Sequence, residues 1–155
     1  MKNNSFLFEL GNFKCIAVSD GTFTYSDQSF YQNAPKEQLQ KVFREYDLQS
    51  GQITTPYTCL FIDTGKHRIL VDTGMGAGVV PSVGNLLMNL QEEGIEGADI
   101  DTVILTHGHP DHIGGIINAE GKQAFPNARY VMWKKEWEFW ASEPDLKQLK
   151  VYYFP

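Results

Sequence analysis

The chain has 155 residues, 42% of them hydrophobic and 21% charged, which is the balance of an ordinary soluble globular domain. Its formal net charge is −6 and it has no run of Lys and Arg, so we do not expect a nucleic acid as a partner. The apolar runs are far shorter than the ~20 residues that cross a bilayer, and the first residues lack an apolar segment of signal-peptide length. We therefore expect a cytoplasmic protein with no membrane partner.

The first third of the chain predicts strands, a loop and then a helix. Residues 6–18 are interrupted at Gly11-Asn12, a pair typical of turns, so we expect two short strands there. Residues 19–33 predict a turn followed by a polar loop. Pro35 is a favoured first residue of a helix, and apolar residues recur after it at helical spacing. They are Leu39, Val42, Phe43 and Tyr46.

A hairpin and a glycine-rich loop follow. Residues 57–72 contain two strand-like arms, 58–62 and 68–71, on either side of a turn. The second arm runs into a loop over residues 72–78 that is rich in Gly. Such a loop can cradle a phosphate, but the Gly-Lys-Ser/Thr ending is absent and no GxGxxG register opens a helix. We interpret these glycines instead as positions where the backbone passes close to a metal site.

The rest of the chain alternates helices and strands. The predicted elements are a helix over residues 83–93, a strand over 101–106, a helix over 112–118, a strand over 128–132 and a helix over 134–141. The strand over 101–106 is an unbroken apolar segment, which is typical of a strand buried on both faces. The alternation of strands and helices places the chain in the α/β class.

Several side chains have two interpretations. Cys15 and Cys59 lie in strand-like segments, where we expect buried free thiols rather than a disulfide. Three tryptophans recur along one helical face, which favours core packing and leaves a substrate-pocket wall as the alternative. They are Trp133, Trp137 and Trp140. Three aromatic side chains of the early loop could line a lipophilic entrance, namely Tyr25, Phe30 and Tyr31.

Three of the chain's four histidines lie within six positions, together with one carboxylate. These four residues are His107, His109, Asp111 and His112. Imidazole and carboxylate ligands suit zinc, and also iron or manganese. Gly108 and Pro110 favour a tight loop, which lets neighbouring side chains point at more than one centre. Gly114 and Gly115 remove bulk where the following helix must pack closely. We therefore predict a metal site directly after a strand.

Residues 106–115, THGHPDHIGG, resemble the HxHxDH signature of the metallo-β-lactamase fold hydrolases. Two further segments match, LVDTG at 70–74 and FPNA at 125–128, so the resemblance covers most of the chain. It implies the N-terminal half of a four-layer αββα sandwich, with a mixed sheet and flanking helices. The turn at 20–23 and the helix at 136–140 are similar to the branch of acyl-homoserine lactonases and organophosphate hydrolases.

The resemblance also implies roles for individual residues. His107 and His109 are expected to bind one metal ion, and Asp111 and His112 a second. Asp111 is implied as the catalytic residue that orients the attacking water. Asp72 is implied to lie behind the ligands and orient them, with a simple turn-forming Asp as the alternative. With two zinc ions expected, or iron or manganese, the implied reaction is hydrolysis of an ester, lactone or phosphoester in a small molecule.

Two other functions remain open at the level of sequence. Persulfide dioxygenases of the same fold use a similar histidine motif around a single iron, so an iron sulfur dioxygenase is one alternative. A non-catalytic metal-binding half-domain is the other, because a family site needs two more histidines and a bridging aspartate. Only His67 lies outside the motif, in the predicted hairpin, where we expect a surface turn residue. We thus expect a single incomplete domain over residues 1–155, completed by a homo-oligomer or a complementing chain.

Overall fold

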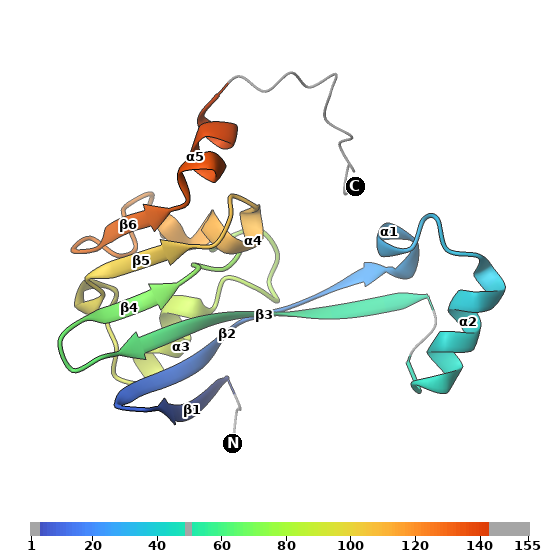
Figure 1. Ribbon diagram of the computed structural model, residues 1–155, viewed down its shortest axis with the longest axis horizontal. Helices are drawn as coiled ribbons and strands as arrows, with labels where there is room; N and C mark the ends of the chain where they lie inside the picture. Colours follow the sequence, from blue (N-terminus) through green and yellow to red (C-terminus); the bar gives the residue numbers. More distant parts are fainter. Residues whose placement is uncertain (1–3, 49–50, 143–155) are drawn as a thin grey trace.

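The computed structural model describes residues 4–48 and 51–142. In these ranges six strands form one mixed sheet, in which neighbours along the chain are also neighbours in space (Figure 1). The strands are β1 (Ser5–Leu10), β2 (Phe13–Ser26), β3 (Gln52–Asp63), β4 (Arg68–Val71), β5 (Thr102–Leu105) and β6 (Arg129–Met132). β1 to β4 pair antiparallel, whereas β4, β5 and β6 pair parallel. The predicted α/β class and mixed sheet are confirmed.

The helices connect and flank these strands. They are α1 (Asp27–Phe30), α2 (Lys36–Glu45), α3 (Leu86–Glu92), α4 (Pro110–Ile113) and α5 (Lys134–Ala141), with 3-10 turns η1 (Gly97–Asp99) and η2 (Gly114–Ile116). The helix predicted over 112–118 is wrong in its bounds, because α4 ends at Ile113 and a tighter turn replaces the rest. Among the described residues, no helix has the length and apolar character needed to cross a membrane.

One face of the sheet carries the hydrophobic core. Phe61, Leu70 and Val103 lie in register on three neighbouring strands and are all buried. α3 packs Leu86 and Leu90 into the same cluster. Because each fully buried Leu or Phe side chain contributes about 1.5–3 kcal/mol, this cluster is what anchors the strands that carry the site.

The opposite face of the sheet is apolar and partly exposed, most of all on the outer strands. Strand register places one row of side chains across all six strands, made of Phe6, Ala17, Leu60, Val71, Ile104 and Val131. Phe6 is 68% exposed, Ile104 37% and Val131 44%. The prediction that the strand over 101–106 is buried on both faces was therefore wrong, because Ile104 of β5 is more than a third exposed on this face.

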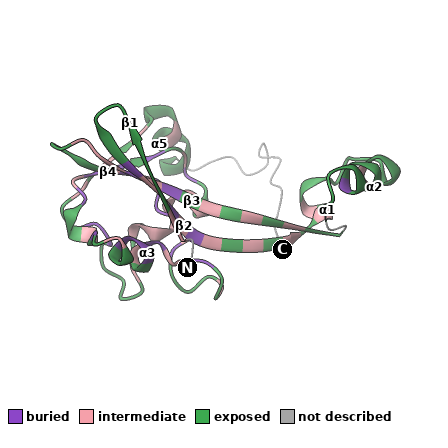
Figure 2. Cartoon of the chain, turned by 90° about the horizontal axis from the view of Figure 1, so that it is seen from below, coloured by how far each residue is buried: buried purple, intermediate pink, exposed green. Residues whose placement is uncertain are grey.

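The loop predicted over residues 19–33 is also wrong, because β2 continues to Ser26 and pairs with β3 from Lys14 to Ser26. The register shifts between Ser19 and Gly21, so the turn-like residues form a bulge within a strand. Beyond the bulge the two strands form a ribbon that projects away from the rest of the sheet and carries α1 and α2 (Figures 1 and 2). Along β2 in this ribbon, half-buried and exposed side chains alternate. Phe23 and Tyr25 are half-buried, and the threonines next to them in the chain are exposed.

Candidate metal centre

The histidine motif begins where β5 ends, beside the end of β4. Because β4 and β5 are parallel, the segments after them leave the sheet at the same edge. The N–H of Asp72 donates to the Ile104 carbonyl at 2.9 Å, which continues the pairing by one residue. Asp72 therefore lies next to Thr106, although 34 positions separate them in the chain. Pro110 then occupies the first turn of α4, where a missing N–H has no consequence.

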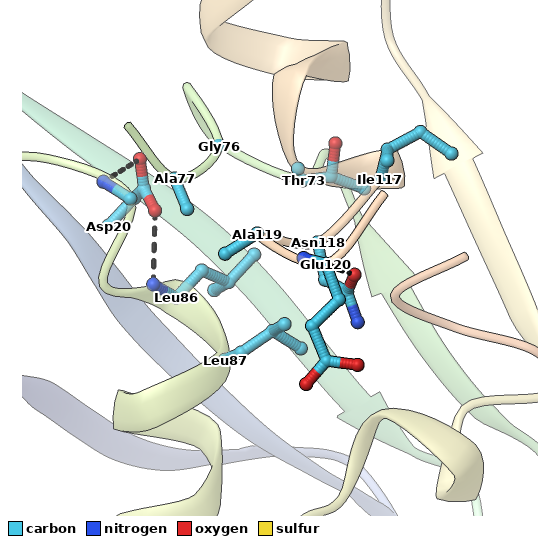
Figure 3. A pocket seen from close by; sticks show the side chains of 12 residues that line it. Asp20, Thr73, Gly76, Ala77, Leu86, Leu87, Ile117, Asn118, Ala119 and Glu120 are labelled. Atoms are coloured by element: carbon cyan, nitrogen blue, oxygen red, sulfur yellow. Dashed lines mark hydrogen bonds between the residues drawn. The ribbon is translucent and has the colours of Figure 1, made fainter. Parts of the chain in front are cut away.

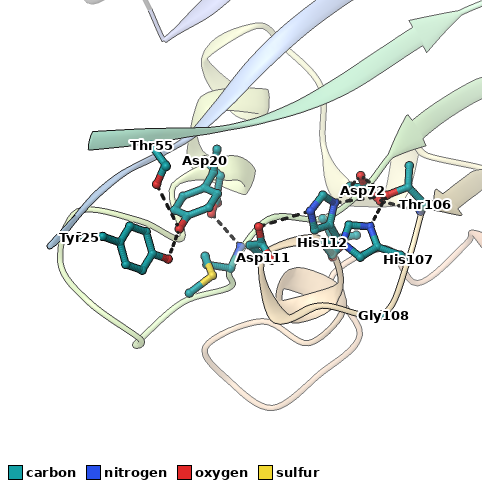
Figure 4. A network of polar contacts seen from close by, with 12 residues as sticks. Asp20, Tyr25, Thr55, Asp72, Thr106, His107, Gly108, Asp111 and His112 are labelled. Atoms are coloured by element: carbon teal, nitrogen blue, oxygen red, sulfur yellow. Dashed lines mark hydrogen bonds and ion pairs between the residues drawn. The ribbon is translucent and has the colours of Figure 1, made fainter. Parts of the chain in front are cut away.

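Asp72 holds two parts of the motif through its carboxylate (Figure 4). The Thr106 N–H donates to Oδ1 at 2.8 Å, and the Thr106 hydroxyl donates to Oδ2 at 2.8 Å. His112 Nδ1 lies 2.8 Å from Oδ2. Asp72 is buried and its φ is +61°, a left-handed conformation that Asp and Asn tolerate better than other side chains. It thus acts both as the turn residue and as the group that orients His112.

The three imidazoles lie against one another. The His107 ring centroid is 3.8 Å from that of His112 and 4.5 Å from that of His109. The Thr106 hydroxyl is 3.1 Å from His107 Nδ1, which leaves the other nitrogen of that ring to face outward. Burial, and then the nearby His112 and His109, lower the pKa of His107, so this ring is inclined to be neutral, as a metal ligand must be.

The donor set fits a divalent metal, and one distance tests the fit. His112 Nε2 lies 3.3 Å from Asp111 Oδ2. Two ligand atoms bound at about 2.0–2.1 Å to a tetrahedral ion are separated by roughly 3.3 Å, so both atoms can reach one ion. Across the described residues, however, no three His, Cys, Asp or Glu side chains converge closely enough to hold an ion by themselves. The fit is therefore that of a partial ligand set.

Backbone packing behind the motif explains its glycines. A Cβ on Gly114 would lie 2.2 Å from the Met75 carbonyl oxygen, and one on Gly115 would lie 2.0 Å from that of Thr73. Thr73 also donates its N–H to the His112 carbonyl at 2.8 Å. The glycine-rich loop and the start of η2 therefore pack backbone against backbone, as predicted. No side chain larger than hydrogen fits between them.

Asp20 is a structural residue that sequence reasoning treated only as part of a turn. Its side chain is fully buried and accepts the backbone N–H groups of Met75 at 2.9 Å, Gly84 at 3.2 Å and Leu86 at 3.0 Å. Burial raises the pKa of Asp20, and these N–H groups oppose that shift. The carboxylate ties the glycine-rich loop to α3. A turn signal alone could not reveal this, since the partners lie 55 or more positions away.

Glu136 is a second residue that the sequence did not single out. Glu136 lies in α5, and its carboxylate accepts a hydrogen bond from the N–H of Gly108, which lies in the middle of the motif. The tryptophans around it are not core residues, so that prediction was wrong: their exposed fractions are 67% for Trp133, 64% for Trp137 and 47% for Trp140. α5 follows β6 and lies at the rim of the described structure (Figure 1).

Tyr25 approaches the site from the ribbon. Its ring packs edge-on against Phe30, with centroids 5.1 Å apart, and its hydroxyl lies 2.5 Å from that of Tyr57. Burial, the Tyr57 hydroxyl and the charge of Asp111 raise the pKa of Tyr25, so it stays a neutral phenol. Tyr31 instead packs against Phe43 of α2. Of the three aromatic residues predicted at a lipophilic entrance, the structure thus places Tyr25 within electrostatic reach of the motif.

The remaining predicted residues lie away from the motif. His67 is in the turn between β3 and β4, with its side chain 51% exposed and 3.4 Å from Asp101, which confirms a surface turn residue. Cys15 and Cys59 are buried free thiols in β2 and β3, as predicted. A cavity of about 220 Å³ lies between the glycine-rich loop, α3 and the segment after η2, and none of the four candidate ligands lines it (Figure 3).

The mixed sheet, the cluster of candidate metal ligands at the end of a parallel strand and the carboxylate behind it define an α/β protein with a candidate metal site. The chain belongs to the metallo-beta-lactamase superfamily, whose family model matches residues 54–154.

Two curated relatives and two solved structures illustrate the similarity. The atrochrysone carboxyl ACP thioesterase of Passalora fulva is 30% identical over 73% of this chain and 30% of its own length. The beta-lactamase-like protein 2 homolog of Drosophila melanogaster is 42% identical over 39% of this chain and 19% of its own. AidC, a dizinc quorum-quenching lactonase solved with a product, is 30% identical with a TM-score of 0.85 over 91% of this chain. The hydrolase AbOPH is 28% identical with a TM-score of 0.82 over 92% of this chain.

The resemblance to the lactonase-like branch is thereby confirmed. This chain spans 48% of the length of either solved structure and 30% or less of the two curated relatives.

Proposed function

We propose that this chain supplies part of the ligand set of a metal centre that hydrolyses an ester, lactone or phosphoester bond in a small molecule. The observation that carries the proposal is the arrangement around His112. Its Nδ1 faces Asp72 at 2.8 Å and its Nε2 lies 3.3 Å from Asp111 Oδ2. A carboxylate that holds the far nitrogen of a histidine is the usual support of a metal-binding imidazole.

In this proposal His107 and His109 hold one ion, and Asp111 and His112 hold the second. Zinc is the expected metal, and iron or manganese share the same donor preferences. Such ions, when bound, lower the pKa of water and stabilise negative charge that develops on oxygen. The chain's own contribution is to hold neutral imidazoles in place and to offer the Asp111 carboxylate. That carboxylate orients the attacking water and accepts its proton.

The substrate class rests on the relatives' chemistry. One similar structure is a lactonase and one relative is a thioesterase, and both reactions attack the carbonyl carbon of an activated acyl group. We therefore place a lactone or another ester-type acyl compound first. The half-buried Tyr25 of β2, whose ring packs edge-on against the exposed Phe30 of α1, supplies apolar surface on the Asp111 side for the organic part of such a substrate. The two free buried thiols are compatible with a reducing compartment, so we propose the cytoplasm.

The open apolar face of the sheet points to a further layer. The row from Phe6 to Val131 exposes apolar side chains on three of the six strands, and exposed apolar patches mark interaction sites. We propose that it is covered by additional polypeptide that also supplies the missing ligands. That polypeptide comes from the same protein, from a second copy or from a complementing chain.

Metal analysis combined with hydrolysis assays tests the proposal in the intact protein. We expect about two divalent ions per site, and turnover of lactones, thioesters or phosphotriesters that Asp111→Ala abolishes. The matched control is His67→Ala, which changes an exposed histidine away from the motif and leaves turnover intact. A single iron with oxygen uptake would contradict hydrolysis and favour the dioxygenase. If residues 1–155 alone turn over substrate as fast as the intact protein, no second ligand set is needed.

A further inference from the structure

α5 reaches the backbone of the histidine motif at Gly108, the residue between His107 and His109. The Gly108 N–H donates to Glu136 Oε1 at 2.9 Å. The Trp140 indole N–H donates to the same oxygen at 2.7 Å. Glu136 and Trp140 are four positions apart on α5 and therefore share one face of the helix. A single carboxylate oxygen thus joins the helix to the backbone of the motif.

Trp140 also closes the space around Gly108. A Cβ on Gly108 would lie 2.3 Å from both Cδ1 and Nε1 of the Trp140 ring, so this position accepts only glycine while the ring stays in place. Gly108 is buried, whereas Trp140 is about half exposed and covers it. The Trp140 ring further meets the His109 ring edge-on, with centroids 6.0 Å apart. α5 therefore contacts both the backbone of the motif, at Gly108, and one of its side chains, that of His109.

Gly108 is the position in this loop where the backbone has the most conformational freedom. β5 ends at Leu105 and α4 begins at Pro110, so the intervening residues lie outside regular secondary structure. Glycine has the greatest backbone freedom of any residue. The Gly108 N–H belongs to the peptide that links it to His107, and rotation of that peptide turns the His107 and His109 side chains relative to each other. The hydrogen bond from this N–H to Glu136 restricts the rotation of that peptide.

We propose that Glu136 is a positioning residue of the metal centre: together with Trp140 it fixes the Gly108 peptide and so presents His107 and His109 in one arrangement. This inference rests on the proposed function, in which these two histidines bind metal. The Gly108 N–H and then the Trp140 indole lower the pKa of Glu136, so the acceptor is an anion at neutral pH. A charged acceptor makes both hydrogen bonds stronger than neutral ones.

The same helix provides a matched control. Glu138 is exposed and pairs only loosely with Lys134, with Nζ and Oε1 3.5 Å apart. Removing its side chain changes the charge of α5 by the same amount as removing that of Glu136, but leaves Gly108 untouched. If Glu136 only anchored α5, its removal would lower the stability of the metal-free and the metal-bound protein alike. The geometry of the metal ligands would then stay the same.

The experiment compares Glu136→Ala, Glu136→Gln and Glu138→Ala in the intact protein. Each variant is stripped of metal and titrated with Zn²⁺ against a chelator, and the visible spectrum of its Co²⁺ form is recorded. We expect Glu136→Ala to lose about 10–100-fold in Zn²⁺ affinity, the usual effect of removing a group that supports metal ligands, and to change the Co²⁺ spectrum. Glu136→Gln keeps a side-chain oxygen for Gly108 and recovers most of the affinity. Glu138→Ala matches the wild type.

The outcomes separate the two proposals. If the wild type binds Zn²⁺ and Glu136→Ala binds it equally well with an unchanged Co²⁺ spectrum, the positioning role is wrong and the proposed function stands. If the wild type binds no divalent metal, the proposed function fails and the positioning role fails with it. Should Glu136→Ala not fold, Glu136→Asp takes its place. It keeps the charge but is one methylene too short to reach Gly108, so the same loss is expected.

Discussion

Replacing Asp72 with Asn tests how the fold prepares His112. Asn tolerates the left-handed backbone at this position, so the change adds no strain there. Its oxygen can still accept the Thr106 N–H. The amide nitrogen then replaces the carboxylate oxygen that lies 2.8 Å from His112 Nδ1. Because an amide NH₂ only donates, His112 must accept at Nδ1 and carry its proton on Nε2. That is the nitrogen that faces Asp111.

The magnitude follows from this change of tautomer. A protonated Nε2 cannot bind metal, and the metal-binding tautomer of the variant lacks the charge-assisted hydrogen bond to the Asp72 carboxylate, worth about 1.5–3 kcal/mol, that it makes in the wild type. Since 1.4 kcal/mol corresponds to a factor of about ten, we expect Zn²⁺ affinity to fall by about 10–100-fold. The metal-free protein should lose only ~1 kcal/mol of unfolding free energy, because the His112 side chain is 28% exposed and water can replace part of the interaction.

Chelator competition measures the metal affinity, and urea denaturation of the metal-free protein measures the stability. Asp63→Asn is the matched control. Asp63 accepts the Gly65 N–H at 2.7 Å in an exposed turn, away from the motif, so its replacement should leave metal binding unchanged. If Asp72→Asn binds Zn²⁺ as tightly as the wild type, the Asp72 carboxylate does not set the His112 tautomer and the reasoning is refuted.

Three further substitutions test the framework of the site. Asp20→Asn places an amide where a buried carboxylate accepts three backbone N–H groups, so the unfolding free energy should fall by about 3 kcal/mol in urea denaturation; an unchanged midpoint would contradict this account. Gly115→Ala drives a Cβ to 2.0 Å from the Thr73 carbonyl oxygen and should lower the melting temperature through a loss of about 1–3 kcal/mol; a wild-type melting curve would show that the loop gives way freely. Hydrogen bonds, first from Thr102, lower the pKa of Asp101 below its ordinary 3.8, so its ionised form stabilises the fold above that pH and this stabilisation disappears as the pH falls through the lower folded value. The stability difference between wild type and Asp101→Asn, measured by denaturation, should therefore shrink towards pH 2, and a difference that stays constant would argue against it.

Local features of the site could be predicted because their causes are local. His107, His109, Asp111 and His112 lie within six positions, and Pro110 and Gly108 determine how a loop passes through them. The glycines around residues 76 and 115 predicted close backbone approach for the same reason: a missing Cβ is visible in the sequence itself. Helix α5 and the hairpin between β3 and β4 likewise follow from short-range periodicity and turn residues.

Other features depended on partners that no local pattern names. The length of β2 depended on pairing with β3, so turn-like residues at Asp20 and Gly21 became a bulge. The exposure of Ile104 and the tryptophans depends on which layers lie over them, which composition does not reveal.

The site shows the same division. The sequence determined which side chains are candidate metal ligands, through their identity and spacing. The family resemblance implied a role for Asp72, but only the tertiary structure decided that it holds His112, across 40 positions, and that Glu136 holds Gly108, across 28. Such contacts arise from the parallel register of β4, β5 and β6, which brings segments distant in the chain to one edge of the sheet.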